Sequence, residues 1–236
     1  MPNKVKVSAI IVAAGDSQRM NGVDKLLAPL GGEPVLARVL EVFQNCKKVD
    51  QIVLVMGLAN IEEGRRIVAL GRWNKISDIA LGGKRRQDSV AEGLKMVKET
   101  EWVIIHDGAR PFVTIDLIEK GLDAAKETGA AAAAVPVTDT IKYVKGSDFV
   151  IQTLPRQYLR AVQTPQVFRA DVIKNSYKFA ASDVTDDAAL VEKSGFKVKL
   201  YMGAYDNIKI TPPGDLAVAG ALWENREKQN ARRNWI

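Results

Sequence analysis

The sequence predicts an α/β fold in which a mostly parallel, twisted sheet carries helices on both faces. Short apolar runs alternate with helical patterns from residue 8 to residue 137, and this order is typical of βαβ units. Glycine-bearing loops follow three of the runs, at Gly15, Gly82 and Gly108. Because ligands bind outside the carboxyl ends of parallel strands, these loops predict a Rossmann-like sheet with a binding site at one edge.

Each apolar run and each helical pattern gives one expected element. A continuous apolar run bounded by turn residues indicates a strand buried on both faces, and apolar positions three to four residues apart indicate a helix. The expected strands are 8–13, 51–56, 76–80, 102–106 and 130–137. The expected helices between them are 35–46, 61–70, 87–99 and 115–128.

The alternation breaks after Val137, and residues 138–160 are expected to form a β-hairpin arm. Runs at 140–144 and 149–154 flank a four-residue turn signal, Lys145-Gly146-Ser147-Asp148. An isolated two-stranded hairpin is at most marginally stable in water, so the arm needs a surface to pack on. A second subunit and the arm's own sheet are both open as that surface.

The rest of the chain returns to helices and strands. A helix is expected at 171–180, and Thr185 is a plausible N-cap of a second helix that ends at Ser194. The remaining elements are strands at 197–202 and 207–211 and a last helix opened by Pro213. No repeat or low-complexity segment divides the chain, so residues 1–236 are expected to form a single domain.

Composition restricts the possible partners. The net charge is +6, but the cations are scattered and aromatic residues make up 6% of the chain, which gives little stacking surface for nucleic acid. A small anionic substrate accounts for the charge. The single Cys46 and the single His106 exclude an internal disulfide and leave no Cys/His zinc site. No apolar run is long enough to span a membrane, so we expect a soluble, cytoplasmic protein without membrane or nucleic-acid partners.

The first expected strand leads into a loop with two cations. Ala13, Ala14 and Gly15 are small and let the backbone approach a ligand closely. Arg19 and Lys25 follow, without the glycine patterns of dinucleotide-binding or ATPase loops. A guanidinium binds phosphate as a fork and an ammonium as a mobile point charge, so the loop predicts a triphosphate site. The alternative is a pair of ordinary solvated cations.

The fourth expected strand leads to a carboxylate, Asp107, on a turn kept open by Gly108. Magnesium favours one or two carboxylates together with phosphate and water, so Asp107 is the metal candidate. Capping of the next segment is its alternative role. His106 is expected to be packed or hydrogen-bonded rather than to act as a general base.

Other residues are expected near the same edge. The pair Gly82-Gly83 permits close backbone approach, and Asp88 or Ser89 can cap the following helix and bind a base or ribose. Arg156, at the base of the arm, and Lys209 are candidates to grip a second phosphate. Simple solvent exposure is the alternative for Lys209.

Together these residues resemble the cytidylyltransferases of the nucleotide-diphosphosugar transferase type, most closely the family that acts on 2-C-methyl-D-erythritol 4-phosphate. The resemblance covers nearly the whole chain. Its motifs are Ala13-Ala14-Gly15 with Arg19-Met20 and Lys25, Gly82-Gly83 with Arg86 and Asp88-Ser89-Val90, His106-Asp107 with Ala109-Arg110-Pro111, Pro136-Val137 with Asp139-Thr140-Ile141-Lys142, Gln163-Thr164-Pro165-Gln166, Thr185-Asp186 and Asn207-Ile208-Lys209. Lys84 departs from the pattern, because an acidic or polar nucleoside contact is expected there.

The resemblance implies a homodimeric, magnesium-dependent enzyme that transfers the cytidylyl group of CTP to methylerythritol phosphate in the non-mevalonate isoprenoid pathway. It implies that Arg156 reaches the neighbouring subunit's site through an exchanged arm. The implied residues are Arg19, Lys25, Arg156 and Lys209 for catalysis, Ala13, Ala14, Gly15, Gly83, Asp88 and Ser89 for the nucleotide, Asp107 for the metal, and Asp107, Gly108, Arg110, Thr140, Arg156, Thr164, Thr185 and Lys209 for the acceptor.

The implied reaction suits the side chains that the chain offers. A phosphate monoester has a second pKa of about 6, so at neutral pH it is mostly dianionic and attacks the α-phosphorus of CTP without a protein base. Catalysis then consists of positioning and charge neutralisation. Two alternatives stay open, namely a cytidylyltransferase for another polyol phosphate such as ribitol 5-phosphate, and a nucleotide- or nucleic-acid-binding module without turnover.

Overall fold

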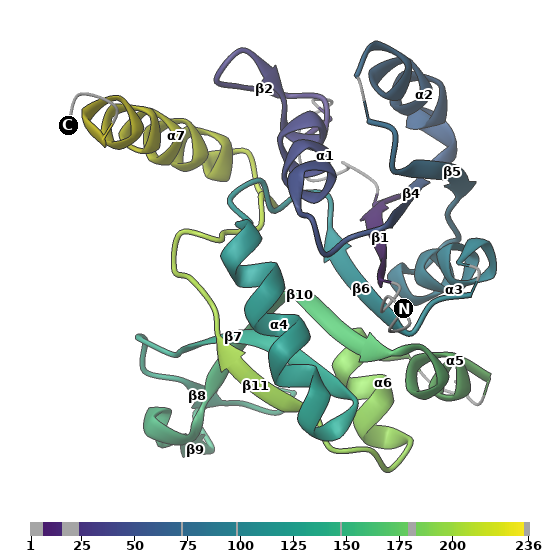
Figure 1. Ribbon diagram of the computed structural model, residues 1–236. Helices are drawn as coiled ribbons and strands as arrows, with labels where there is room; N and C mark the ends of the chain where they lie inside the picture. The colour runs from purple at the N-terminus through teal and green to yellow at the C-terminus, as the bar shows by residue number, and fades with distance from the viewer. Residues whose placement is uncertain are drawn as a thin grey trace.

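A seven-stranded sheet forms the centre of the computed structural model, which describes residues 7–15, 24–71, 73–97, 99–146, 148–178 and 183–233 (Figure 1). The strand order is β11-β7-β10-β6-β1-β4-β5. The bounds are β1 Val7–Ala13, β4 Gln51–Met56, β5 Ile76–Leu81, β6 Trp102–Asp107, β7 Ala130–Pro136, β10 Arg160–Arg169 and β11 Lys199–Met202. β10 is antiparallel to both β6 and β7, whereas the other pairs are parallel. The predicted, mostly parallel sheet is confirmed.

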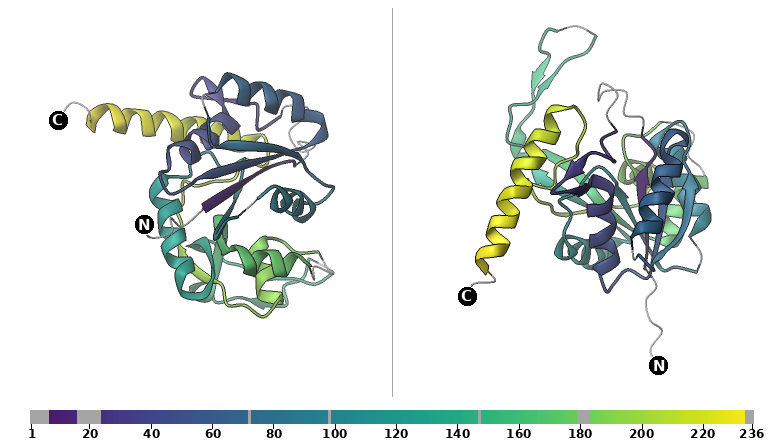
Figure 2. Two further views of the ribbon diagram at one scale, coloured as in Figure 1. Left: turned by 45° about the vertical axis from the view of Figure 1, so that its right-hand side comes forward. Right: turned by 90° about the horizontal axis from the view of Figure 1, so that it is seen from above.

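Helices cover both faces of this sheet (Figures 1 and 2). Their bounds are α1 Val35–Asn45, α2 Ile61–Leu70, α3 Arg86–Met96, α4 Ile115–Thr128, α5 Ala170–Lys178, α6 Asp187–Lys193 and α7 Gly214–Arg233. Side chains of α1, α2 and α4 share one core cluster with Ala9 and Ile11, and side chains of α3, α5 and α6 share another with Ile10. Alternate residues of a strand face opposite sides, so β1 is buried on both faces, as predicted.

The chain between β7 and β10 leaves the sheet as the arm that was expected at 138–160, and it projects from the body (Figure 2). Its paired strands are shorter than predicted, because β8 is Lys142–Tyr143 and β9 is Gln152–Thr153. A 3₁₀ turn, Arg156–Tyr158, leads back towards β10. Large apolar side chains on the arm stay exposed, namely Phe149 at 83%, Tyr158 at 79% and Ile151 at 59%. The arm's own sheet therefore leaves these side chains uncovered.

The segment 207–211 was predicted to be a strand, and this prediction is wrong. It runs as irregular chain beside the loop after β6, where Ile210 N donates to Ala109 O at 2.9 Å. Ile208 and Ile210 create the alternating pattern because they pack into a small core cluster with side chains of α7. The apolar alternation thus reflects packing against a helix rather than membership of the sheet.

Two further local predictions need correction. The N-cap of α6 is Asp186 rather than Thr185, because the Asp186 side chain accepts a hydrogen bond from Ala189 N, three residues on. A short hairpin, β2 Pro29–Leu30 with β3 Glu33–Pro34, and the long antiparallel strand β10 had no counterpart among the expected strands. Within the described ranges, no helix combines the length and apolar character that a membrane crossing needs.

Candidate active site

A cavity of about 900 Å³ opens at the carboxyl ends of β1, β4, β5 and β6. Eight residues predicted for the site line it: Ala13, Ala14, Gly15, Lys25, Gly83, Ser89, Asp107 and Lys209. Parallel pairing of β1 with β4 and β6 brings these distant segments to one edge of the sheet. The prediction that the glycine-bearing loops meet there is confirmed. Arg19 lies outside the described residues.

The nucleotide loop between β5 and α3 requires its two glycines. A Cβ on Gly82 would collide with Ala14, and a Cβ on Gly83 would collide with Asp88. The Ser89 hydroxyl accepts from Gly83 N at 3.2 Å, which fixes the loop to the first turn of α3. Asp88 is not among the residues that line the cavity. Its carboxylate instead accepts from Arg85 N at 3.1 Å in a capping box.

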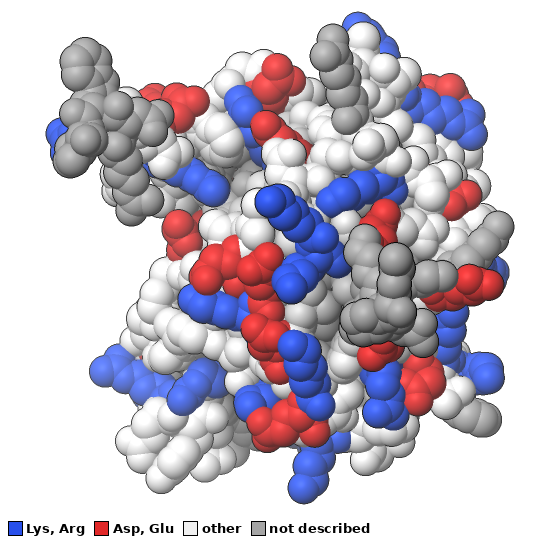
Figure 3. Space-filling view, viewed as in Figure 1, with Lys and Arg blue, Asp and Glu red and all other residues white. Residues whose placement is uncertain are grey.

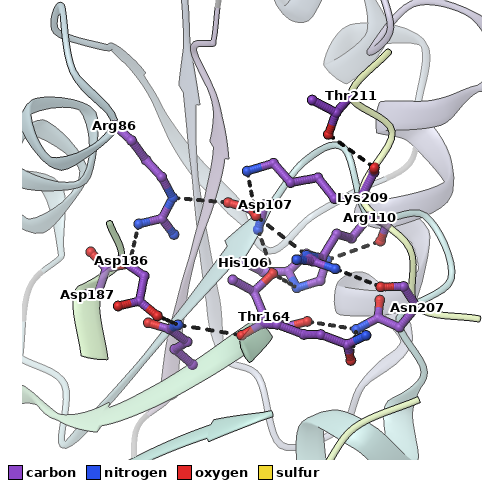
Figure 4. A network of polar contacts seen from close by, with 12 residues as sticks. Arg86, His106, Asp107, Arg110, Thr164, Asp186, Asp187, Asn207, Lys209 and Thr211 are labelled. Carbon is purple, nitrogen blue, oxygen red and sulfur yellow. Dashed lines mark hydrogen bonds and ion pairs between the residues drawn. The ribbon is translucent and has the colours of Figure 1, made fainter. Parts of the chain in front are cut away.

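Asp107 is the electrostatic centre of the cavity floor (Figure 4). Its carboxylate lies 3.1 Å from Arg86 Nε, 3.0 Å from Lys209 Nζ and 3.5 Å from Arg110 Nε. Burial by itself raises the pKa of a carboxyl group. Here the three cations outweigh burial and hold the pKa of Asp107 well below its usual range, so the group stays ionised at neutral pH.

Lys209 reaches Asp107 because its irregular segment is anchored at two points. Arg110 Nη1 donates to Asn207 O at 2.7 Å, and Asn207 Nδ2 donates to Thr164 O at 2.9 Å. Asn207 is fully buried, whereas the Lys209 side chain is 38% exposed. The segment therefore presents the Lys209 cation to the cavity, while Asn207 holds the backbone to the loop after β6 and to β10.

His106 is buried behind the cavity and linked to Thr164. Arg110 O accepts a hydrogen bond, so the His106 Nε2 that lies 3.2 Å away carries the proton. Nδ1 is then an acceptor, and the Thr164 hydroxyl donates to it at 3.1 Å while accepting from Asp107 N at 3.0 Å. Burial lowers the pKa of His106 to about 4. The prediction that this histidine is packed and hydrogen-bonded is confirmed.

Other predicted acceptor residues lie apart from this cavity. Thr140, Arg156 and Thr185 are exposed and are not among its lining residues. Arg156 Nη1 donates to Thr138 O at 2.6 Å at the base of the arm. Gly108 is buried beneath the loop, where its N–H donates to Val12 O at 2.8 Å. Within a single chain, most of the residues predicted to bind the nucleotide thus lie together at the cavity, whereas the predicted residues of the arm lie apart from it.

The described residues do not form a preformed metal cage. No group of three or more His, Cys, Asp or Glu side chains among them is placed to hold a metal ion. Asp107 offers a single carboxylate, and Arg86, Arg110 and Lys209 already face it. A magnesium ion here needs phosphate oxygens of a ligand for most of its coordination.

The sequence did not assign a role to Arg86 or Asp187, whereas the structure pairs Arg86 with both Asp107 and Asp187. Arg86 Nη1 donates to Asp187 Oδ2 at 2.7 Å, and the Asp187 side chain is 1% exposed. The sequence offered one signal for a role of Arg86, because this residue directly follows the nucleotide loop and belongs to a motif of the resemblance. Its partner lies 101 residues further along the chain, so no local pattern reveals the pair.

Surface charge on one face of the molecule is mixed. In Figure 3, Lys and Arg are interspersed with Asp and Glu over the face that Figure 1 shows. Among the described residues, several opposite charges form ion pairs within one helix, such as Arg65 with Glu62 and Lys120 with Asp116. This face offers no continuous basic stripe of the kind that tracks a nucleic-acid backbone.

Comparison with known proteins identifies the family. The family model described as 2-C-methyl-D-erythritol 4-phosphate cytidylyltransferase matches residues 7–225. The chain belongs to this cytidylyltransferase family. It is 49% identical over 217 residues to the protein of that name from Dehalococcoides mccartyi, covering 92% of this chain and 96% of the relative. The relative from Clostridium novyi is 44% identical, with 93% and 97% coverage.

Solved structures of the family share the fold. 4-Diphosphocytidyl-2C-methyl-D-erythritol synthase from Anaerococcus prevotii aligns with a TM-score of 0.83 and 33% identity, over 94% of this chain and 97% of that one. The 2-C-methyl-D-erythritol 4-phosphate cytidylyltransferase from Thermus thermophilus aligns with a TM-score of 0.77 and 30% identity, over 93% and 100%. The family membership thus rests on both sequence and fold.

Proposed function

We propose that this chain transfers the cytidylyl group of CTP to 2-C-methyl-D-erythritol 4-phosphate, releasing pyrophosphate and forming 4-diphosphocytidyl-2-C-methyl-D-erythritol for isoprenoid-precursor biosynthesis. Membership of the family supports the reaction. One observation supports the location of the site: Lys25, Asp107 and Lys209 line the same cavity as the two glycine-bearing nucleotide loops.

CTP occupies the part of the cavity between β1 and α3. Ala13 ends β1, Ala14 and Gly15 follow it, and Gly83 and Ser89 lie on the opposite wall. The small residues admit the base and ribose close to the backbone. Asp88 contributes by fixing the first turn of α3 through its capping box. The wall continues to Lys84, which also lines the cavity and adds positive charge where the family pattern favours an acidic or polar contact.

The acceptor phosphate approaches from the side of Asp107 and Lys209. As a dianion it attacks the α-phosphorus of CTP, so that a new P–O bond forms while the bond to pyrophosphate breaks and the leaving oxygen keeps the electron pair. Lys25, with Arg19 from outside the described residues, neutralises the charge that develops on the departing pyrophosphate. No protein base is required, because the dianionic acceptor phosphate is itself the nucleophile, and the buried His106 is neutral.

Asp107, which now faces Arg86, Arg110 and Lys209, would hold a magnesium ion through one carboxylate oxygen, and phosphate oxygens of CTP would supply most of the other ligands. The ion would supply Lewis-acid stabilisation of phosphate charge. Gly108 keeps the loop after β6 close to β1. Thr164 and Arg110 contact Asp107 from the side away from the cavity. The acceptor is bound by Thr140, Thr185, Arg156 and Lys209.

The active form is a homodimer joined by the arm. Phe149, Ile151 and Tyr158 expose large apolar surfaces on a projecting hairpin, and a two-stranded hairpin gains stability by packing on another surface. A second copy covers these side chains and receives Arg156 at its acceptor site. This placement explains why Arg156 does not line the cavity of its own chain.

Pyrophosphate release tests the proposed function. The purified protein is incubated with CTP and magnesium and with either 2-C-methyl-D-erythritol 4-phosphate or ribitol 5-phosphate, and the initial rates are compared. We expect the methylerythritol substrate to be preferred by at least about 100-fold in kcat/KM, since an acceptor hydroxyl pattern mismatched to buried polar groups is discriminated this strongly. Preference for ribitol phosphate, or nucleotide binding without turnover, would contradict the proposal. Chelation of the metal is expected to abolish turnover, and added magnesium to restore it.

A further inference from the structure

Three consecutive residues at the start of α3 hold one distant segment of the chain. Arg85 forms an ion pair with Asp183, and the Gln87 side-chain oxygen accepts from Val184 N at 3.1 Å. Arg86 Nη1 donates to Asp187 Oδ2 at 2.7 Å. We call residues 183–187, which include Thr185, the acceptor segment. Contacts from successive residues of one helix turn fix both the position and the orientation of this segment.

The ion pair between Arg86 and Asp187 is buried, so substitution of either residue is expected to disturb the segment. The Asp187 carboxylate also accepts from the Tyr177 hydroxyl at 2.6 Å. Burial and the neighbouring Asp187 raise the pKa of Tyr177, so its hydroxyl stays protonated and donates. A buried ion pair contributes little net stability when intact, but removal of one partner leaves an uncompensated charge. The pair therefore favours one arrangement of the segment over others.

Arg86 connects this segment to the centre of the cavity. Its Nε donates to Asp107 Oδ1 at 3.1 Å while its Nη1 holds Asp187 (Figure 4). Its Nη2 is buried and has no hydrogen-bond partner among the described residues, so it is a donor available to a ligand oxygen. The acceptor segment is also held from its other side, because Gln166 donates to Asp186 Oδ2 at 2.8 Å and accepts from Ala188 N at 3.0 Å.

We propose that Arg86 and Gln87 are positioning residues that clamp the acceptor segment and the Asp107 carboxylate into the geometry that binds the acceptor phosphate. The inference rests on the proposed function, whose acceptor site includes Thr185 and Asp107. The clamp begins at the nucleotide loop, so a single helix turn supports both halves of the site. Neither Gln87 nor Asp187 is among the residues that line the cavity, so their influence on the acceptor passes through the clamp.

Substitutions outside the cavity test the clamp. Gln87→Met removes the acceptor for Val184 N at nearly constant volume, and Asp187→Asn removes the charge that holds Arg86. We expect each to raise KM for the acceptor about five- to tenfold, the effect of losing one positioning hydrogen bond, with KM for CTP changed less than about twofold. Gln87→Glu keeps a side-chain oxygen that can accept from Val184 N, so its KM for the acceptor is expected to stay close to the wild-type value. Arg169→Gln is the matched control, because it loses an exposed pair with Asp171 far from the cavity.

Hydrogen exchange gives a readout that does not depend on turnover. In Gln87→Met the amide of Val184 is expected to exchange faster than in the wild type, and in Arg169→Gln at the wild-type rate. The clamp would be overturned by any of three results. These are unchanged exchange at Val184, an unchanged KM for the acceptor in folded variants, and an equal rise in KM for the acceptor and for CTP. Absence of pyrophosphate release by the wild type would instead refute the proposed function, and exchange at Val184 would then decide the clamp.

Discussion

At the scale of single residues, the site depends on a few charges of fixed sign. Asp107 is held ionised by three cations, and His106 is held neutral by burial. Lys25 and Lys209 face the same cavity. This distribution suits a reaction between two phosphorylated molecules, because such a reaction needs charge neutralisation rather than a proton acceptor.

Removal of the Lys25 ammonium tests this interpretation. Lys25→Ala is expected to lower kcat by about 100-fold or more, since loss of one donor to a developing anion typically has this effect. Lys95→Ala is the matched control, because Lys95 forms an exposed pair with Glu92 on α3 and is expected to leave kcat unchanged. Steady-state pyrophosphate release measures both variants. A Lys25→Ala enzyme with normal turnover would remove Lys25 from the catalytic machinery.

The buried histidine predicts a pH dependence of stability. The pKa of His106 is about 4 in the folded chain and 6.5 as the reference for the unfolded chain. Between these values the unfolded chain binds the proton and the folded chain does not, so stability falls as the pH decreases. We expect a loss of about 1.5 kcal/mol between pH 6.5 and pH 5 from this group.

Urea unfolding at several pH values measures this contribution. His106→Gln retains polar side-chain atoms but has no proton to gain, so its stability is expected to depend less on pH over the same interval. Carboxyl groups titrate mostly below this interval and affect both proteins alike. Identical pH slopes in the two proteins would show that His106 already titrates normally in the folded chain.

At the scale of elements, the first turn of α3 carries several tasks. Gly82 and Gly83 bring the nucleotide loop against β1, and Ser89 fixes the loop through its hydroxyl. Arg85, Arg86 and Gln87 hold the acceptor segment. The loop and the first turn of the helix are therefore linked by close packing and by hydrogen bonds. A change in the loop geometry is expected to affect nucleotide binding first.

Gly83→Ala tests the packing of this loop. The added Cβ would collide with Asp88 in the capping box, so the loop must shift away from α3. We expect KM for CTP to rise about tenfold and the free energy of unfolding to fall by about 1–3 kcal/mol, as overpacking usually costs. Gly220→Ala is the matched control, because nothing lies within 4 Å of a Cβ there and alanine favours a helix. A Gly83→Ala enzyme with unchanged KM for CTP would contradict the tight fit.

At the scale of the whole molecule, the single chain leaves its arm uncovered. The arm projects from the body and exposes Phe149, Ile151 and Tyr158. The proposed dimer covers these side chains and brings Arg156 to the partner's cavity. The cytoplasmic location and the single-domain organisation stay predictions.

Mixing two inactive variants tests the shared site. Arg156→Ala and Lys25→Ala chains are each expected to be nearly inactive as homodimers. Random pairing makes half of the dimers mixed, and each mixed dimer regains one of its two sites, so about a quarter of the wild-type activity is expected. Proven heterodimers without recovered activity would show that each chain uses its own Arg156.

Much of the fold followed from short stretches of sequence. The apolar run of β1, the helix at 115–128 and the glycine pair 82–83 act through local periodicity and sterics, so their positions were predictable. The segment 207–211 was misassigned because its alternation arises from packing against α7. The N-cap at Asp186 lies one residue from its predicted place, because two adjacent side chains were both suitable caps.

The sequence by itself determined the α/β order, the edge of the sheet where the loops meet and the chemical types of the residues gathered there. Only the tertiary structure decided that Arg86 joins Asp107 to Asp187, that Lys209 arrives on irregular chain, and that the arm stands away from its own sheet. The physical reason is the separation along the chain over which each interaction acts. Backbone sterics and apolar periodicity act within a few residues, whereas an ion pair across 101 positions exists only after several elements have packed together.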